Sequence, residues 1–267
     1  MRNILAAGVL WALSVTGTLA DGSLRQLMTA DESRGFEAIG RIQLDARSFC
    51  TGTLIGDALV LTAAHCLFDA RTHEKRDLSQ VEFRAGWRDG RALAYRAVRR
   101  AIIHPDYAVN AATQGTARVV NDVALLVLDR PIRGNGITPF VTAGKPHKGE
   151  PVGVVSYAVN REERPSLENA CTVLSRPARL IVISCSVDFG ASGAPILSFA
   201  DGQPRIVSVV SAKAESMGRP VALGVDIDGS IDLLLALARD RPTLLREPAA
   251  MIRRTGSAAT AAKFVRP

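Results

Sequence analysis

The sequence predicts an all-β protein built as a sandwich or as barrels. Much of the 267-residue chain consists of short apolar runs rich in valine and isoleucine, and glycine, proline, aspartate or asparagine separates them. Runs of this length with such boundaries are typical of strands rather than helices. Many short strands spread over about 200 residues indicate sandwiches or closed barrels. The clearest runs lie at 37–44, 58–64, 123–128, 151–159, 179–185 and 205–212.

One segment near the end of the chain has the marks of a helix instead. Ser230 can cap a helix over residues 231–239. Asp232 lies in the first turn of this segment and Arg239 near its end, where each charge suits the helix dipole. Pro242 follows and ends the pattern.

The first 20 residues have the composition of a secretory signal peptide. Arg2 precedes an uncharged apolar run, and small residues up to Ala20 suit signal cleavage. A membrane anchor is the rival interpretation, but the apolar core is short for a spanning helix and no stop-transfer pattern follows. We therefore expect a secreted or periplasmic protein without stable membrane insertion after signal removal. Residues 21–35 are either a propeptide or an N-terminal arm.

The formal net charge of +7 does not by itself indicate a nucleic-acid partner. The sequence shows no clustered basic and aromatic face and no nucleic-acid motif, so no such partner is expected. The charge is interpreted as a solvated surface together with a basic tail over residues 243–267. This tail is predicted to be disordered, and its alternative role is to bind a membrane or a partner.

Four cysteines, an even number in an exported chain, favour disulfides. Three pairings are open, and proximity along the chain suggests Cys50–Cys66 and Cys171–Cys185. A zinc site is disfavoured because no CxxC pair occurs and the spacings are long. No metal or other cofactor is expected.

His65 and Asp122 are the first pair of residues that could take part in catalysis. His65 directly follows an apolar run, and Asp122 is wedged between two such runs. A buried carboxylate needs a partner to offset its lost hydration. A histidine held by a carboxylate through one ring nitrogen can accept a proton through the other.

Ser192 lies in GASGAP, residues 190–195, which could be a plain tight turn or a nucleophile loop. An attacking hydroxyl needs a base, and the oxyanion that forms needs aimed N–H donors. The N–H groups of Gly190 and Ser192 are the candidate oxyanion donors. The chain order His, Asp, Ser distinguishes one known arrangement of the catalytic triad from the others.

Three motifs together resemble the chymotrypsin/trypsin-like serine protease family, in its bacterial secreted branch. They are CTGTLIGDALVLTAAHC, IIHPDYAVN followed by NDVALLVLDRPI, and CSVDFGASGAPIL, and the resemblance covers residues 36–240. It implies two antiparallel β-barrels packed face to face, a C-terminal helix, and an active site in the cleft. The first barrel would span residues 36–142, and the second barrel with the helix 143–242.

The resemblance also implies a role for each candidate residue. His65 would be the general base, Asp122 its orienting partner and Ser192 the nucleophile. Cys50–Cys66 matches the family's disulfide beside the histidine. Ser211 matches a serine that supports the buried aspartate and lines the substrate channel.

The chain departs from the family pattern next to the nucleophile. The family usually has an aspartate there, which pairs with an N-terminus freed by cleavage, whereas this chain has Ala191 and lacks the matching N-terminus. The loop must then be ordered in another way, or the oxyanion hole is not formed. Asp188 is a candidate replacement contact, although an exposed loop carboxylate is the favoured interpretation.

The resemblance places Ser186, Ser211 and Lys213 at the primary substrate pocket. Ser186 occupies the pocket base, where a trypsin-like specificity would need aspartate. Lys213 replaces a frequent glycine, and its longer side chain would narrow the pocket or attract an acidic group. Val210 stands near the position where glutamyl-specific relatives have histidine, which argues against that specificity.

The sequence therefore supports two hypotheses of function. The first is an exported serine endopeptidase that cleaves protein or peptide substrates through an acyl-enzyme intermediate. The alternative is a catalytically inactive secreted homologue that binds a partner through the same cleft, motivated by Ala191. A monomer is expected in either case.

Overall fold

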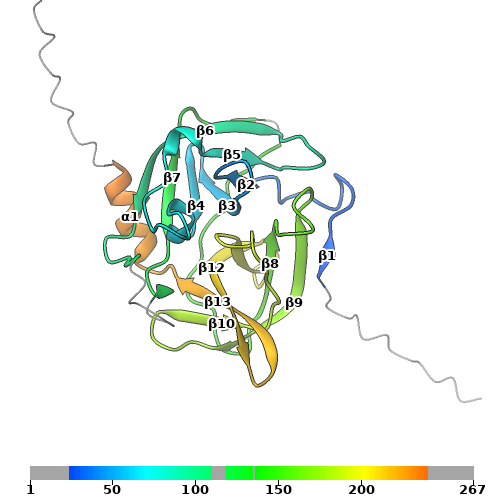
Figure 1. Ribbon diagram of the computed structural model, residues 1–267. Coiled ribbons are helices and arrows are strands. Elements are labelled where there is room, and N and C mark those ends of the chain that lie inside the picture. Colours follow the sequence, from blue (N-terminus) through cyan, green and yellow to red (C-terminus); the bar gives the residue numbers. More distant parts are fainter. Residues whose placement is uncertain (1–23, 110–117, 135, 240–267) are drawn as a thin grey trace, which may run out of the picture.

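The computed structural model describes residues 24–109, 118–134 and 136–239. The predicted signal peptide and basic tail lie outside these residues. The strands form two antiparallel barrels (Figure 1), which confirms the predicted all-β, chymotrypsin-like class. None of the helices in the described part of the chain has the length and apolar character needed to cross a membrane.

The first barrel closes in the strand order β2-β3-β4-β7-β6-β5. Each apolar run supplies a strand with one buried face, and β7 is buried along its whole length. Antiparallel strands that close on themselves leave no unpaired sheet edge. The strands are β2 (Ile39–Gln43), β3 (Phe49–Gly56), β4 (Leu59–Thr62), β5 (Glu82–Ala85), β6 (Ala94–Ile103) and β7 (Ala124–Leu128).

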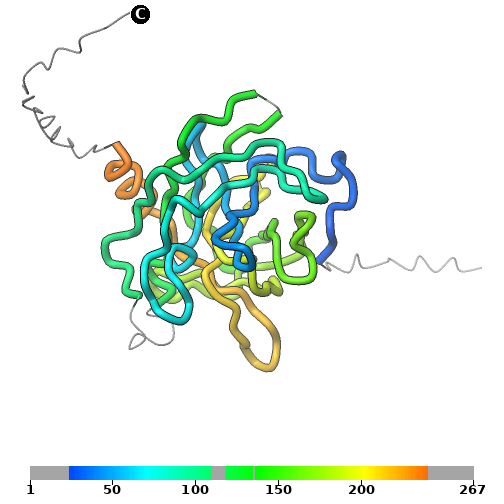
Figure 2. Tube along the Cα trace, turned by 45° about the horizontal axis from the view of Figure 1, so that its top comes forward, coloured from blue at the N-terminus to red at the C-terminus, as the bar shows by residue number. Residues whose placement is uncertain are grey.

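The second barrel has the order β9-β10-β13-β12-β11-β8, and pairing of β8 with β9 closes it. Figure 2 shows the long β12–β13 hairpin projecting from the body of the molecule. The strands are β8 (Pro151–Ser156), β9 (Ser166–Ser175), β10 (Leu180–Ile183), β11 (Pro195–Ser198), β12 (Arg205–Ser216) and β13 (Arg219–Asp226).

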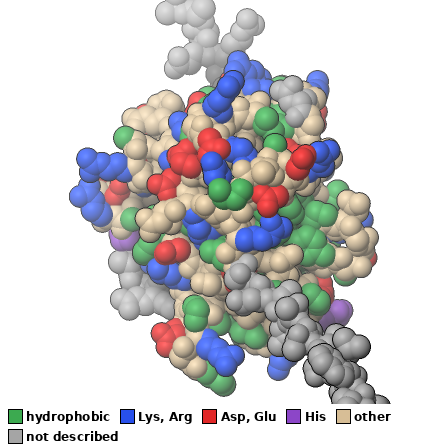
Figure 3. Space-filling view, turned by 90° about the vertical axis from the view of Figure 1, so that its right-hand side faces the viewer, with side chains coloured by type: hydrophobic (Ala, Val, Ile, Leu, Met, Phe, Trp, Pro, Cys, Tyr) green, Lys and Arg blue, Asp and Glu red, His purple; other side chains and the backbone are tan. Residues whose placement is uncertain are grey.

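The described N-terminal residues pack against the second barrel. Strand β1 (Arg25–Gln26) pairs with β9, and Leu27 is fully buried. The guanidinium of Arg88, from the first barrel, donates to the Leu27 carbonyl over 2.7 Å. This segment therefore contacts both barrels. On the same side of the molecule, acidic and basic side chains are interspersed rather than segregated (Figure 3).

Helix α1 (Ser230–Arg239) matches the predicted segment, with one difference at its start. Ser230 is the first helical residue rather than a cap outside the helix, and its buried hydroxyl bonds to the Arg179 guanidinium at 2.7 Å. Although α1 follows the second barrel in sequence, it packs against β6 and β7 of the first (Figure 1).

The cysteines pair as proximity along the chain suggested. Cys50–Cys66 joins β3 to the 3-10 turn η1 (Ala64–Leu67), and Cys171–Cys185 joins β9 to the segment after β10. Both sequence separations are short, 16 and 14 residues.

Removing Cys171–Cys185 should destabilise the fold without unfolding it. Closing a loop of this length restricts the unfolded chain and stabilises the native state by about 3 kcal/mol. The double variant Cys171→Ser/Cys185→Ser should therefore lose about 3 kcal/mol of unfolding free energy in urea titrations. Unchanged stability in oxidised samples would contradict this expectation.

Candidate active site

His65 and Asp122 meet at one end of the first barrel. His65 lies in η1, directly after β4, and Asp122 lies just before β7, which pairs with β4. Nδ1 of His65 is 2.6 Å from Oδ2 of Asp122, and the His65 backbone N–H donates to Oδ1 over 2.7 Å. The Asp122 side chain is only 3% exposed, whereas the His65 ring is 30% exposed. One carboxylate thus fixes both the ring and the backbone of this histidine.

Ser211 reaches the same carboxylate from the second barrel. Its hydroxyl donates to Oδ2 of Asp122 from strand β12. The carboxylate therefore has three donors, two from one barrel and one from the other. Because Asp122 is almost enclosed, these donors replace the water that it loses on burial.

The environment of His65 shifts its pKa in two opposing directions. Burial alone lowers the pKa of the ring, because it disfavours the charged form. The charge of Asp122 and the hydrogen bond to it raise the pKa, while Arg118 lowers it slightly. The net result is a pKa above the usual 6.5.

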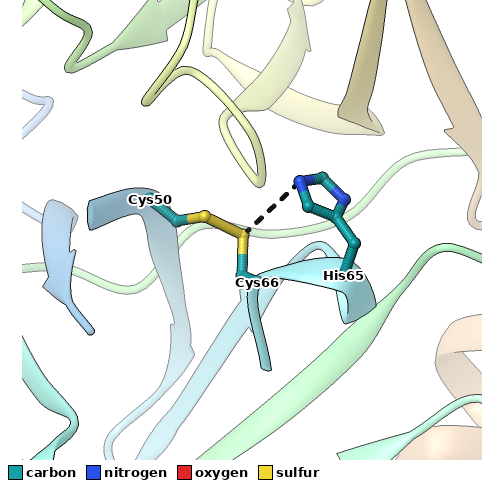
Figure 4. Close-up of side chains that lie close together, drawn as sticks. All are labelled: Cys50, His65 and Cys66. Carbon is teal, nitrogen blue, oxygen red and sulfur yellow. Dashed lines mark hydrogen bonds between the residues drawn. A yellow bond between two sulfur atoms is a disulfide. The ribbon is translucent and has the colours of Figure 1, made fainter. Parts of the chain in front are cut away.

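Ser192 lies between β10 and β11, on the same cleft as His65. Sγ of Cys66 is 4.0 Å from Nε2 of His65 and 4.0 Å from the carbonyl oxygen of Ser192. Figure 4 draws the contact between Cys66 and the His65 ring as a dashed line. Among the described residues, no hydrogen bond joins the Ser192 hydroxyl to the His65 ring. Such catalytic bonds are often long without substrate and tighten when substrate binds.

The N–H of Gly190 is left unpaired by its neighbours. Val159 donates its N–H to the carbonyl of Phe189 over 2.8 Å. Carbonyl and N–H point in opposite directions across a trans peptide, so the Gly190 N–H points away from Val159. Gly190 has φ of +95°, a conformation that favours glycine. No described residue accepts its N–H, and Gly190 lines the cleft.

The N–H of Ser192 is free for the same reason. Ala194 donates its N–H to the carbonyl of Ala191 over 3.0 Å, which fixes the peptide between Ala191 and Ser192. Its N–H therefore points the opposite way, and no acceptor for it occurs in the described part of the chain. Two unpaired N–H donors beside one serine can stabilise an oxyanion.

Ser186 and Lys213, which the resemblance places at the substrate pocket, make separate contacts in the structure. Ser186 is exposed, and its N–H donates to Oε2 of Glu168 over 2.9 Å. Lys213 crosses to the facing loop, where Nζ is 2.9 Å from Oδ1 of Asp188 and 4.1 Å from the Phe189 ring centroid. Asp188, favoured from sequence as a solvated loop carboxylate, thus has a cationic partner.

Sequence reasoning missed two residues that form hydrogen bonds to the segment 186–192. Glu168, on β9, accepts from Ser186, and its pKa is raised by burial despite this bond and the nearby Arg161. Thr51, on β3, is fully buried and bonds to the carbonyls of Gly190 and Ser192. The CTGT motif contained Thr51, but nothing local marked its hydroxyl as functional.

Neither cysteine pair can bind a metal as thiolate. The sulfurs of Cys50 and Cys66 lie beside His65, and those of Cys171 and Cys185 lie beside Glu168. All four are oxidised in disulfides, which removes the thiolate that a metal would need.

The cleft at His65 has two parts. One, of about 470 Å³, contains Ser192 and Gly190 and is flanked by aromatic rings, among them Phe49 and Phe189. The other, of about 360 Å³, lies on the side of Asp122 and Ser211. Together they offer an extended chain a path on either side of His65, which suits a peptide substrate.

Comparisons with known proteins show the family and the fold of this chain. The family model Trypsin matches residues 29–175, more than half of the chain. A solved structure titled "Structure of Glu endopeptidase in complex with MPD" matches with a TM-score of 0.68 and 18% sequence identity. The match covers 83% of this chain and 99% of that one. No curated protein sequence matches the chain.

Proposed function

The chain belongs to the trypsin family, and on this basis we propose that it is an exported serine endopeptidase that acts through an acyl-enzyme intermediate. Ser192 attacks the scissile carbonyl, and His65 accepts its proton and passes it to the leaving amine. Asp122 holds the imidazole and stabilises its charged form. The N–H groups of Gly190 and Ser192 bind the oxyanion. Water then releases the acyl group.

One observation carries this proposal. The almost fully buried carboxylate of Asp122 lies 2.6 Å from Nδ1 of His65. Nε2 of this ring is therefore available as a base in the cleft that contains Ser192. A histidine that merely filled the core would not need a partly exposed ring on a cleft beside two unpaired N–H donors. The arrangement is that of an oriented base near an alcohol.

Export is part of the proposal and has separate support. Both disulfides need an oxidising compartment to persist, and the first 20 residues read as a signal peptide. Either the periplasm or the exterior of the cell satisfies this condition. Strand β1 and the buried Leu27 support an N-terminal arm that stays attached, rather than a propeptide that leaves.

The charges around the predicted primary pocket do not favour an acidic residue before the cleaved bond. Lys213 is paired with Asp188 at 2.9 Å, whereas burial lowers the pKa of Arg161 against the opposing charges of Asp188 and Glu168. The Asp188 carboxylate therefore competes with an acidic substrate residue for Lys213. The acidic specificity in the name of the Glu endopeptidase is accordingly not proposed for this chain.

Shortening Lys213 should widen the primary pocket. Lys213→Ala removes the side chain that crosses to Asp188 and covers Phe189. We expect kcat/KM for peptides with a large apolar residue before the cleaved bond to rise about 10-fold. Lys148→Ala, at an exposed site outside the cleft, removes the same charge as a control. An equal change in both variants would show that net charge, not pocket width, matters.

A fluorophosphonate probe tests the proposed activity directly. The protein from residue 21 onward should be labelled, and Ser192→Ala should not, because the probe reacts only with an activated serine. Absence of labelling in folded, disulfide-bonded protein would overturn the protease proposal. It would favour the inactive homologue that binds a partner through the cleft.

A further inference from the structure

We infer that Thr51 is the positioning residue that holds the nucleophile loop, residues 188–194, in the shape that frees its two oxyanion donors. This inference rests on the proposed function. Ala191 has only a methyl group and offers no polar side chain to anchor this loop from within. Contacts from outside the loop therefore add to its own backbone hydrogen bonds in setting its conformation, and Thr51 supplies more than one of them.

Thr51 binds the loop on both sides of Ala191. Its hydroxyl donates to the Gly190 carbonyl over 2.9 Å, and its backbone N–H donates to the Ser192 carbonyl over 2.9 Å. The Tyr157 N–H donates to the same hydroxyl over 3.1 Å. The hydroxyl thus accepts from the second barrel, and the Gly190 carbonyl is a closer acceptor for its one proton than the Tyr157 carbonyl at 3.3 Å.

These contacts determine which N–H groups remain free. The peptide from Gly190 to Ala191 is held at its carbonyl by Thr51 and at its N–H by the Asp188 carbonyl, 3.0 Å away. The peptide from Ser192 to Gly193 is held by Thr51 and by the Val210 carbonyl, 2.8 Å away. The two proposed oxyanion donors belong to the peptides Phe189–Gly190 and Ala191–Ser192. In each of these peptides only the carbonyl forms a hydrogen bond.

The loop also lies directly against strand β3. A Cβ at Gly193, where φ is +81°, would come within 2.2 Å of the Thr51 carbonyl oxygen. A Cβ at Gly190 would come within 2.4 Å of the Phe49 ring. Backbone contact this close explains how one hydroxyl on β3 can control the loop, because a small displacement would break the bond.

Strand β3 contains a matched control for Thr51. Thr53 lies two residues further along and is 1% exposed, but its buried hydroxyl has no hydrogen-bond partner among the described residues. Thr→Val removes the same hydroxyl at either position with little change in volume. Only at position 51 does the change leave the Gly190 carbonyl and the Tyr157 N–H without this partner.

The test compares Thr51→Val, Thr51→Ser and Thr53→Val in kinetics on a peptide substrate. Thr51→Val should lower kcat about 10- to 100-fold with little change in KM, because misplaced oxyanion donors act only in the transition state. Thr51→Ser keeps the hydroxyl and should retain most of the activity. Thr53→Val should match the wild type.

Hydrogen exchange separates this inference from the proposed function. Exchange in the peptide covering residues 188–194 should quicken in Thr51→Val and not in Thr53→Val, whether or not the protein labels with fluorophosphonate. Missing wild-type labelling would overturn the protease proposal alone. Unchanged exchange and kcat in Thr51→Val, or equal losses in both valine variants, would overturn the role of Thr51.

Discussion

Replacing Ser192 with alanine should lower kcat on a peptide substrate by roughly 10⁶-fold. The variant retains His65 and the two N–H donors, but no hydroxyl remains to form the acyl-enzyme. Catalysis would then depend on water attacking within the cleft. A residual rate of about 10³- to 10⁴-fold over uncatalysed hydrolysis is expected from the oxyanion donors and substrate binding.

Steady-state kinetics with a matched serine control decide this prediction. Ser48 lines the same cleft on the side of Phe49, so Ser48→Ala tests whether any change of a cleft hydroxyl reduces the rate. We expect Ser48→Ala to keep activity near that of the wild type. If Ser192→Ala kept more than about one hundredth of the wild-type kcat, Ser192 would not be the nucleophile.

Asp122→Asn should lower kcat by about 10⁴-fold while the fold stays intact. The carboxylate accepts hydrogen bonds from the His65 ring, the His65 backbone and the Ser211 hydroxyl. An amide has one acceptor oxygen and an NH2 group that donates. With the NH2 group facing Nδ1, the imidazole carries its proton on Nε2, and this tautomer cannot take the proton of Ser192. Thermal unfolding of the variant serves as the control for folding.

The same variant should move the acid limb of the pH profile. In the wild type Asp122 raises the pKa of His65 against the opposing effects of burial and Arg118. His65 gains a proton and stops acting as a base as pH falls through this pKa, so kcat/KM should fall with a midpoint above 6.5. Without the charge of Asp122 the midpoint should shift to lower pH. An unchanged midpoint would show that another group controls the limb.

Local patterns were sufficient to predict much of this protein. Short apolar runs between turn residues predicted the strands, because burial of one sheet face leaves that signature in the sequence. Residues 231–239 were predicted as a helix from its terminal residues, and the structure has α1 there. Two of the four cysteines lie 16 residues apart and the others 14 apart, and these short separations favoured the pairing that the structure shows.

Contacts between the barrels were not predictable in this way. Thr51 and Gly190 are 139 residues apart, and the buried threonine next to Thr51 along β3, Thr53, has no bond to the loop at all. Sequence could not tell these two threonines apart. The pairing of Lys213 with Asp188 likewise depends on the distance between β12 and the facing loop.

The sequence by itself determined the strand content, the order of His65, Asp122 and Ser192 along the chain, and a helix near its end. Tertiary structure alone decided that α1 packs on the first barrel, that Lys213 pairs with Asp188, and that Thr51 bonds to the loop of Ser192. The physical reason is one of range. Periodicity and turn chemistry act over a few residues, whereas these contacts join groups that only the packing of two closed barrels brings within hydrogen-bonding distance.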